Sequence, residues 1–71
     1  MIYKIYVVEY QGSWQLKEVA YNYEELTKKL THIDPNIYAM YMVVRRDIKQ
    51  DMDEILVIED ISNWKSRKMN F

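Results

Sequence analysis

The sequence of 71 residues contains no cysteine, one histidine, one glycine and one proline. The lack of cysteine excludes a disulfide framework and any thiolate metal site. With His32 as the single histidine, a histidine-based metal cluster is excluded as well. A lone Gly12 cannot form a glycine-rich loop of the kind that binds phosphates. We therefore expect a protein without a metal or another cofactor.

The chain also lacks a large excess of charge of either sign. Ten basic and eleven acidic side chains give a net charge of −1, so no overall field attracts nucleic acid or a membrane surface. No apolar run approaches the ~20 residues that span a bilayer. The N-terminal stretch MIYKIYVVEYQ has no small-residue cleavage site, so we expect no signal peptide. These features favour a cytoplasmic protein with no membrane partner.

The residue usage is skewed toward amino acids with AT-rich codons. The chain has eight isoleucines, seven tyrosines and seven lysines, but only two alanines and three arginines. This bias indicates an AT-rich genome, such as that of a low-GC bacterium, one of its phages or a mobile element.

The length of 71 residues predicts one domain that spans the chain from 1 to 71. A domain of this size buries only about 60% of the surface that its unfolded chain exposes. Proteins below roughly 70–80 residues usually need a disulfide, a metal or a partner subunit for stability. Of these three, the composition leaves only a partner subunit, and so self-association, open.

Two strands and a hairpin are expected at the N-terminus. Residues 2–10 are rich in β-branched and aromatic side chains, which is typical of a strand. Gly12 is expected to supply the positive φ of a tight turn. Residues 13–20 then form the returning strand. Its alternation is imperfect between Lys17 and Ala20, which indicates a bulge.

A helix is expected next. Asn22 suits the N-cap, and Glu25 three residues later can return a hydrogen bond to it. The pairs Glu24–Lys28 and Glu25–Lys29 have the favourable i, i+4 order. Pro35 should force Asp34 out of helical geometry and so end the helix. The expected apolar stripe consists of Tyr23, Leu26, Leu30 and Ile33.

Two more strands are expected at 37–46 and 54–60, joined by a polar hairpin loop. Residues 61–71 could form a short helix or fray. The order is ββαββ. It predicts an α+β domain with a four-stranded, largely antiparallel sheet and one main helix on one face.

The third strand, IYAMYMVVRR, is apolar on both faces. Tyr38, Met40 and Met42 alternate with Ala39, Tyr41 and Val43, whereas a sheet with one wet face should alternate apolar with polar residues. One helix of about 15 Å can cover about half of one face. Two interpretations remain: the tail around Trp64 covers the second face, or that face is an interface.

We favour the interface, because tyrosine and methionine are enriched at protein contacts. The function predicted is a non-enzymatic protein–protein interaction module: a homodimer, an inhibitor or an adaptor, with itself or another protein as partner. The expected interface residues are Tyr6, Tyr10, Tyr38, Met40 and Met42.

The alternative is single-stranded nucleic-acid binding, with bases stacked on sheet tyrosines. The basic residues for this role are Arg45, Arg46, Lys65, Arg67 and Lys68. Glu9 and Glu18 lie on the strands of this platform, and residues 47–60 hold six acidic residues against Lys49 alone, so a phosphate backbone would be repelled there.

The sequence offers little for catalysis, and we expect no catalytic residues. His32 lies in the last turn of the expected helix, where a cation is stabilised by the helix dipole. Asp47, Asp51, Asp53 and Glu54 resemble calcium ligands only loosely, because the glycine and the regular ligand spacing of an EF-hand loop are missing. A solvated turn is the better interpretation.

Overall fold

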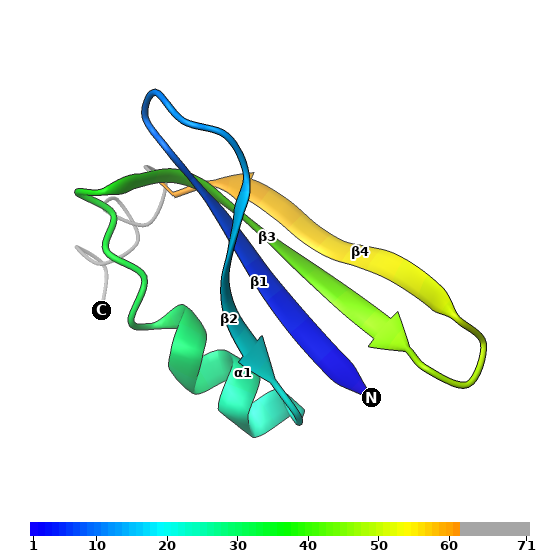
Figure 1. Ribbon diagram of the computed structural model, residues 1–71. Coiled ribbons are helices and arrows are strands. Elements are labelled where there is room, and N and C mark those ends of the chain that lie inside the picture. Colours follow the sequence, from blue (N-terminus) through cyan, green and yellow to red (C-terminus); the bar gives the residue numbers. More distant parts are fainter. Residues whose placement is uncertain (62–71) are drawn as a thin grey trace.

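The computed structural model describes residues 1–61 (Figure 1). It contains five elements: β1 (Ile2–Glu9), β2 (Gln15–Ala20), α1 (Tyr23–Leu30), β3 (Tyr38–Asp47) and β4 (Met52–Asp60). The four strands form one sheet in the order β2-β1-β3-β4, and every neighbouring pair is antiparallel. The expected α+β class and ββαββ order are confirmed. The expected tail or short helix at 62–71, with Trp64, lies outside the described residues.

The helix begins as its sequence predicts. Asn22 has an extended backbone, and its Oδ1 accepts a hydrogen bond of 2.8 Å from the Glu25 backbone N–H. Both expected i, i+4 ion pairs are present, at 3.7 Å for Glu24–Lys28 and 3.2 Å for Glu25–Lys29. The cap therefore fixes where α1 starts, directly after β2.

The helix ends earlier than expected, at Leu30 rather than near Pro35. The Thr31 backbone N–H bonds to the carbonyls of Lys28 and Lys29, which tightens and closes the last turn. Ile33 keeps its expected burial, at 3% exposed, although it lies in the loop after the helix. Tyr23 is 69% exposed and does not belong to the buried stripe. The sequence prediction was therefore wrong about the end of the helix and about the burial of Tyr23.

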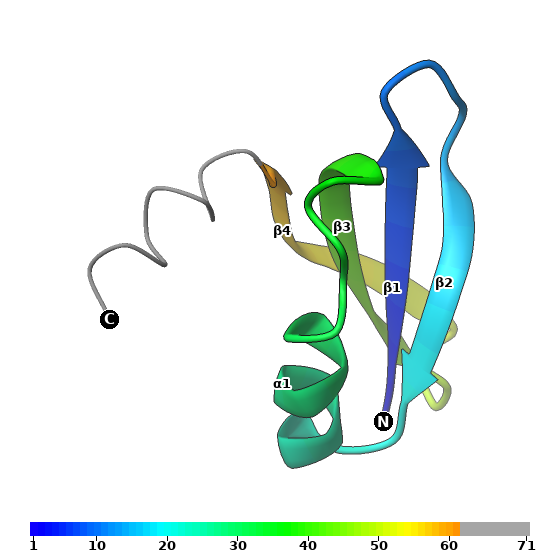
Figure 2. The ribbon, with the colours of Figure 1, turned by 90° about the vertical axis from the view of Figure 1, so that its left-hand side faces the viewer.

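The core lies between the sheet and α1. Ile5, Val7 and Val43 from the sheet are at most 1% exposed and pack in one cluster with Leu26 of α1. The helix contacts β2 and β1 (Figures 1 and 2). Ile61, which is fully buried and donates its backbone N–H to the Ala39 carbonyl, closes the cluster beyond β4. One short helix therefore covers part of one face of the sheet.

Three register shifts change which way side chains point. The shift in β2 passes over Lys17, which confirms the expected bulge. The shift in β3 passes over Ala39, so Tyr38 lies on the same side as Tyr41 and packs against the core. The expectation that Tyr38 shares a face with Met40 and Met42 is therefore wrong, because one extra residue reverses the alternation.

The third shift, in β4, passes over Leu56. Ile55 pairs with Val44 and Ile58 pairs with Met42, so Ile55 and Ile58 lie on one face. Simple alternation along β4 would place these two residues on opposite faces, because they are three positions apart. The bulge at Leu56 is the physical reason for the difference.

The two hairpin connections differ from the sequence prediction. Gly12 does not adopt a positive φ, because a five-residue connection, 10–14, replaces the expected tight turn. Its N–H donates to the Glu9 carbonyl at 3.2 Å. The positive φ occurs instead at Asp51, at 52°, in the turn between β3 and β4. That turn is shorter than expected, since β4 already begins at Met52.

Candidate interaction surface

The sheet has a second face, opposite α1, which we call the open face. Residues paired across neighbouring strands point to the same side of a sheet, so the register assigns its members. They are Ile2, Lys4, Tyr6 and Val8 of β1, Leu16 and Val19 of β2, Met40, Met42, Val44 and Arg46 of β3, and Asp53, Ile55, Ile58 and Asp60 of β4.

Two central rows run across all four strands. We call Val19, Lys4, Val44 and Ile55 the first row, in the spatial order of the strands. The second row is Leu16, Tyr6, Met42 and Ile58. Seven of these eight side chains are uncharged, and Lys4 is the exception. The result is an apolar band across the full width of the sheet.

Most of this band is open to solvent. Leu16 is 52% exposed, Ile55 60% and Ile58 51%, Tyr6 and Met42 are half-buried, and Val44, at 7%, is the buried member. Within residues 1–61, α1 lies on the other side of the sheet (Figure 2) and no described helix covers the band. A contiguous apolar patch that stays exposed is a recognised mark of a contact surface.

Lys4 stands at the middle of the band, between Val19 and Val44. It is half-buried, and no carboxylate of residues 1–61 lies within ion-pair distance of it. A partner that covers the band must therefore accept this ammonium group.

The residues expected at an interface divide into two groups. Tyr6, Met40 and Met42 lie together on the open face. Tyr10 lies in the loop after β1, and its hydroxyl donates a 3.0 Å hydrogen bond to the Pro35 carbonyl, which ties that loop to the one after α1. Tyr38 packs on the core side, with the Lys17 ammonium 5.6 Å from its ring centre.

Sequence reasoning missed the contribution of the two edge strands. Leu16, Val19, Ile55 and Ile58 supply half of the two central rows. The available signal was the imperfect alternation in both segments, but only the register shifts at Lys17 and Leu56 show which side chains share a face.

The free edge of β2 is protected against a further strand. The Lys29 ammonium donates a 2.7 Å hydrogen bond to the Val19 carbonyl and lies 3.7 Å from the Glu18 carboxylate. The bulge at Lys17 also bends the ladder. Lysine side chains and bulges are common devices that prevent edge-to-edge pairing.

The free edge of β4 carries acidic residues at both ends. If two β4 strands paired antiparallel about Leu56 and Val57, Glu54 would lie opposite Glu59 of the other copy. Like charges directly opposite each other destabilise a strand pair. The two edges are therefore poorer contact surfaces than the open face.

The arginines of the nucleic-acid hypothesis are occupied. Arg45 is bound by Glu54 at 2.6 Å, and Arg46 is bound by Asp53 at 3.2 Å and also by Asp51. Hydrogen bonds with Asp53 and Asp51 raise the pKa of Arg46 above its ordinary value. Lys65, Arg67 and Lys68 lie outside the described residues.

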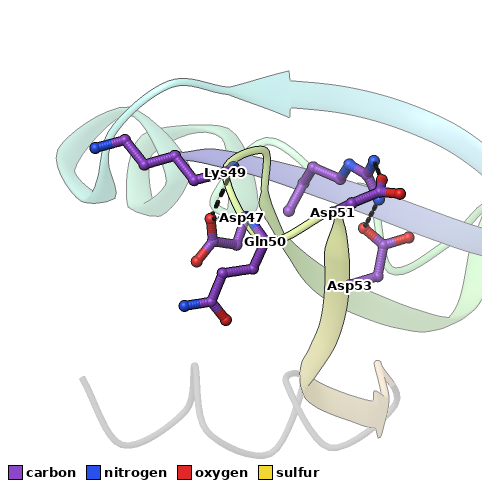
Figure 3. Close-up of polar contacts among 6 residues, drawn as sticks. Asp47, Lys49, Gln50, Asp51 and Asp53 are labelled. Atoms are coloured by element: carbon purple, nitrogen blue, oxygen red, sulfur yellow. Dashed lines mark hydrogen bonds and ion pairs between the residues drawn. The ribbon is translucent and has the colours of Figure 1, made fainter.

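The acidic residues between 47 and 54 have structural partners at the turn between β3 and β4. Figure 3 shows Asp47, Lys49 and Gln50 at the turn and Asp51 and Asp53 where β4 begins. The Asp47 carboxylate accepts the backbone N–H groups of Lys49 and Gln50, at 3.1 and 3.2 Å. These contacts show that the acidic residues stabilise the turn. Residues 1–61 contain no group of three or more ligands that could hold a metal ion.

His32 lies just past the end of α1, with its Nδ1 atom 2.8 Å from the Lys28 carbonyl oxygen. The same carbonyl, in the last turn of α1, also accepts the Thr31 N–H and hydroxyl, so His32 adds to the contacts that close the helix C-terminus. This contact supports the structural role expected from the sequence.

No helix among the described residues is long and apolar enough to cross a membrane. Comparison of the chain with protein-family models, with curated proteins and with solved structures gives no significant match.

Proposed function

We propose that the protein is a non-enzymatic protein–protein interaction module that binds its partner through the open face. The observation that supports this most is the band of eight side chains that crosses all four strands, of which only Val44 is buried. The largest apolar patch on a monomeric protein is often functional. The protection of both sheet edges adds support for a contact through the face.

Two further features agree with a contact surface of this kind. Met40 and Met42 are flexible and polarisable, and such side chains adapt to the shape of a partner. Tyr6 offers a large ring with a polar tip, a combination that is enriched at interfaces. The expected origin from a phage or mobile element and the cytoplasmic location stay predictions.

Single-stranded nucleic acid is the competing ligand class. Its stacking platform would need several free cations beside the tyrosines. Lys4 lies beside Tyr6, but the carboxylates of Glu54, Asp51 and Asp53 hold Arg45 and Arg46. No contact of the described residues favours this function over protein binding.

The test compares three versions of the chain as bait: wild type, Met42→Asp and Tyr23→Asp. Met42→Asp puts a charge into the second row, whereas Tyr23→Asp adds the same charge at a 69% exposed site on α1. A retained protein is identified, purified and titrated against each version. We expect Met42→Asp alone to weaken binding, by at least tenfold. Equal binding by all three versions would show that the open face is not the contact surface.

A further inference from the structure

The open face has the size of a small but specific interface. Four strands about 4.8 Å apart and four rows of side chains about 6.8 Å apart give roughly 500 Å² per copy. Two such faces together bury about 1,000 Å², which is the lower limit for a specific protein contact. A contact of this area is expected to be weak and concentration-dependent.

The two central rows are complementary to each other under a two-fold rotation. Consider an axis in the plane of the sheet, perpendicular to the strands and midway between the rows. It places each residue of the first row over the residue of the second row on the same strand of the other copy. Val19 then meets Leu16, Val44 meets Met42, and Ile55 meets Ile58, so that apolar side chains cover apolar side chains.

The same rotation places Lys4 over Tyr6 of the other copy, because both lie on β1. A lysine ammonium over a tyrosine ring is a favourable cation–π contact. The rotation makes this contact twice, as an isologous interface requires. It provides for the one charge in the two central rows. In the outer rows the same rotation places Arg46 over Met40 and Asp53 over Asp60 of the other copy, at the rim of the contact.

The other simple axis runs parallel to the strands, between β1 and β3. It places Lys4 over Val44 of the other copy and leaves the ammonium group without a partner. Covering a charge without a partner is costly. Lys4 therefore selects the first axis over the second.

From these observations we propose that the partner of the open face is a second copy of this chain. The two sheets pack face to face about a two-fold axis perpendicular to the strands, with Lys4 of each copy over Tyr6 of the other. This inference rests on the proposed function of the open face and adds the identity of the partner and its orientation. The two sheets lie about 10 Å apart, and β4 and β2 of one copy lie over β4 and β2 of the other.

The first measurement is the solution mass by light scattering behind a sizing column, over about 5–500 μM. Wild type is expected to rise from the 8.7 kDa of one chain toward twice that mass. Tyr23→Asp should behave like wild type, and Met42→Asp should remain monomeric with an unchanged circular dichroism spectrum. A wild-type chain that is monomeric at every concentration overturns the inference.

Two pairs of variants test the Lys4–Tyr6 contact. Lys4→Met and Tyr6→Phe keep the bulk of the side chains and should change the dimer dissociation constant less than threefold. Lys4→Glu places a carboxylate over the negative face of the ring and should raise the constant at least tenfold, as should Tyr6→Leu because the ring is lost. Equal constants for Lys4→Glu and Lys4→Met would refute the contact.

Cross-linking tests the axis, and the cysteine-free sequence gives no background. A short bismaleimide should join Ile55→Cys in one chain to Ile58→Cys in another. It should not join Leu16→Cys to Ile58→Cys, which the proposed axis keeps three strand spacings apart. The reverse result would establish the parallel axis and overturn the geometry.

These results separate the two proposals. A monomer whose binding to another protein is lost in Met42→Asp refutes the second copy as partner and retains the proposed function. A monomer that binds no protein through this face refutes both. A monomer that instead binds a labelled single-stranded oligonucleotide would replace both with the nucleic-acid hypothesis.

Discussion

The Lys29 side chain joins α1 to β2 through three contacts, and its loss should cost more stability than an exposed ion pair would. The ammonium group donates to the Val19 carbonyl at 2.7 Å and lies 3.2 Å from Glu25 and 3.7 Å from Glu18. Lys29→Met keeps the aliphatic stem and the helix propensity but removes the charge. Lys28→Met is the matched control, because Lys28 pairs only with Glu24, at 3.7 Å, among the described residues.

The size of the effect follows from the contacts. A hydrogen bond from a charged donor contributes about 1.5–3 kcal/mol, and the lower end applies because the Lys29 side chain is 33% exposed. The two ion pairs add a few tenths of a kcal/mol each. We therefore expect Lys29→Met to lower the free energy of unfolding by about 2 kcal/mol. Lys28→Met should lower it by at most about 0.5 kcal/mol, since its side chain is 73% exposed.

Urea unfolding followed by circular dichroism, at a few micromolar protein, measures both variants. A domain of 71 residues has a free energy of unfolding of about 4–11 kcal/mol, so a loss of 2 kcal/mol is readily measured. It should also lower Tm by about 8–16 °C. If the two variants differed by less than about 0.5 kcal/mol, Lys29 would not connect the helix to the edge strand as described.

Three further predictions test the fold. Leu26→Ala, at a site that is 4% exposed, should lower the free energy of unfolding by about 2–4 kcal/mol, whereas Leu56→Ala, at 42%, should cost less than about 1 kcal/mol in the same urea titration. Asn22→Ala should cost about 1 kcal/mol by loss of the helix cap, and Asn22→Ser should restore most of it. Tyr10→Phe removes only the hydroxyl bond to Pro35 and should cost about 0.5–1 kcal/mol by thermal unfolding; a loss above 2 kcal/mol would mean that the hydroxyl does more than make one exposed hydrogen bond.

The start of the helix and its ion pairs could be predicted from the sequence, because a cap and i, i+4 contacts depend on neighbouring residues. The end of the helix could not. Ile33 continues the apolar period of Leu26 and Leu30, but it reaches the core from the following loop. A periodic pattern does not distinguish a further helical turn from a loop that folds back onto the same core.

The apolar character of both sheet faces was visible in the sequence, but the membership of the open face was not. Each of the three bulges reverses the alternation between the residues before it and those after it. Tyr38 thereby leaves the open face and Ile55 joins Ile58. Bulges depend on contacts between strands that are distant in the sequence, so alternation within one strand cannot reveal them. The same holds for the strand order β2-β1-β3-β4.

The central position of β1 has a consequence for synthesis on the ribosome. β1 is made first, yet one of its two neighbours, β3, is made only after β2 and α1. Val43, which pairs with Ile5, follows it by a stretch that takes about 2–8 s to translate. During that interval the nascent chain holds a two-stranded hairpin with an unpaired, apolar edge. A hairpin alone is marginally stable in water, so the domain should fold only when β3 has left the exit tunnel.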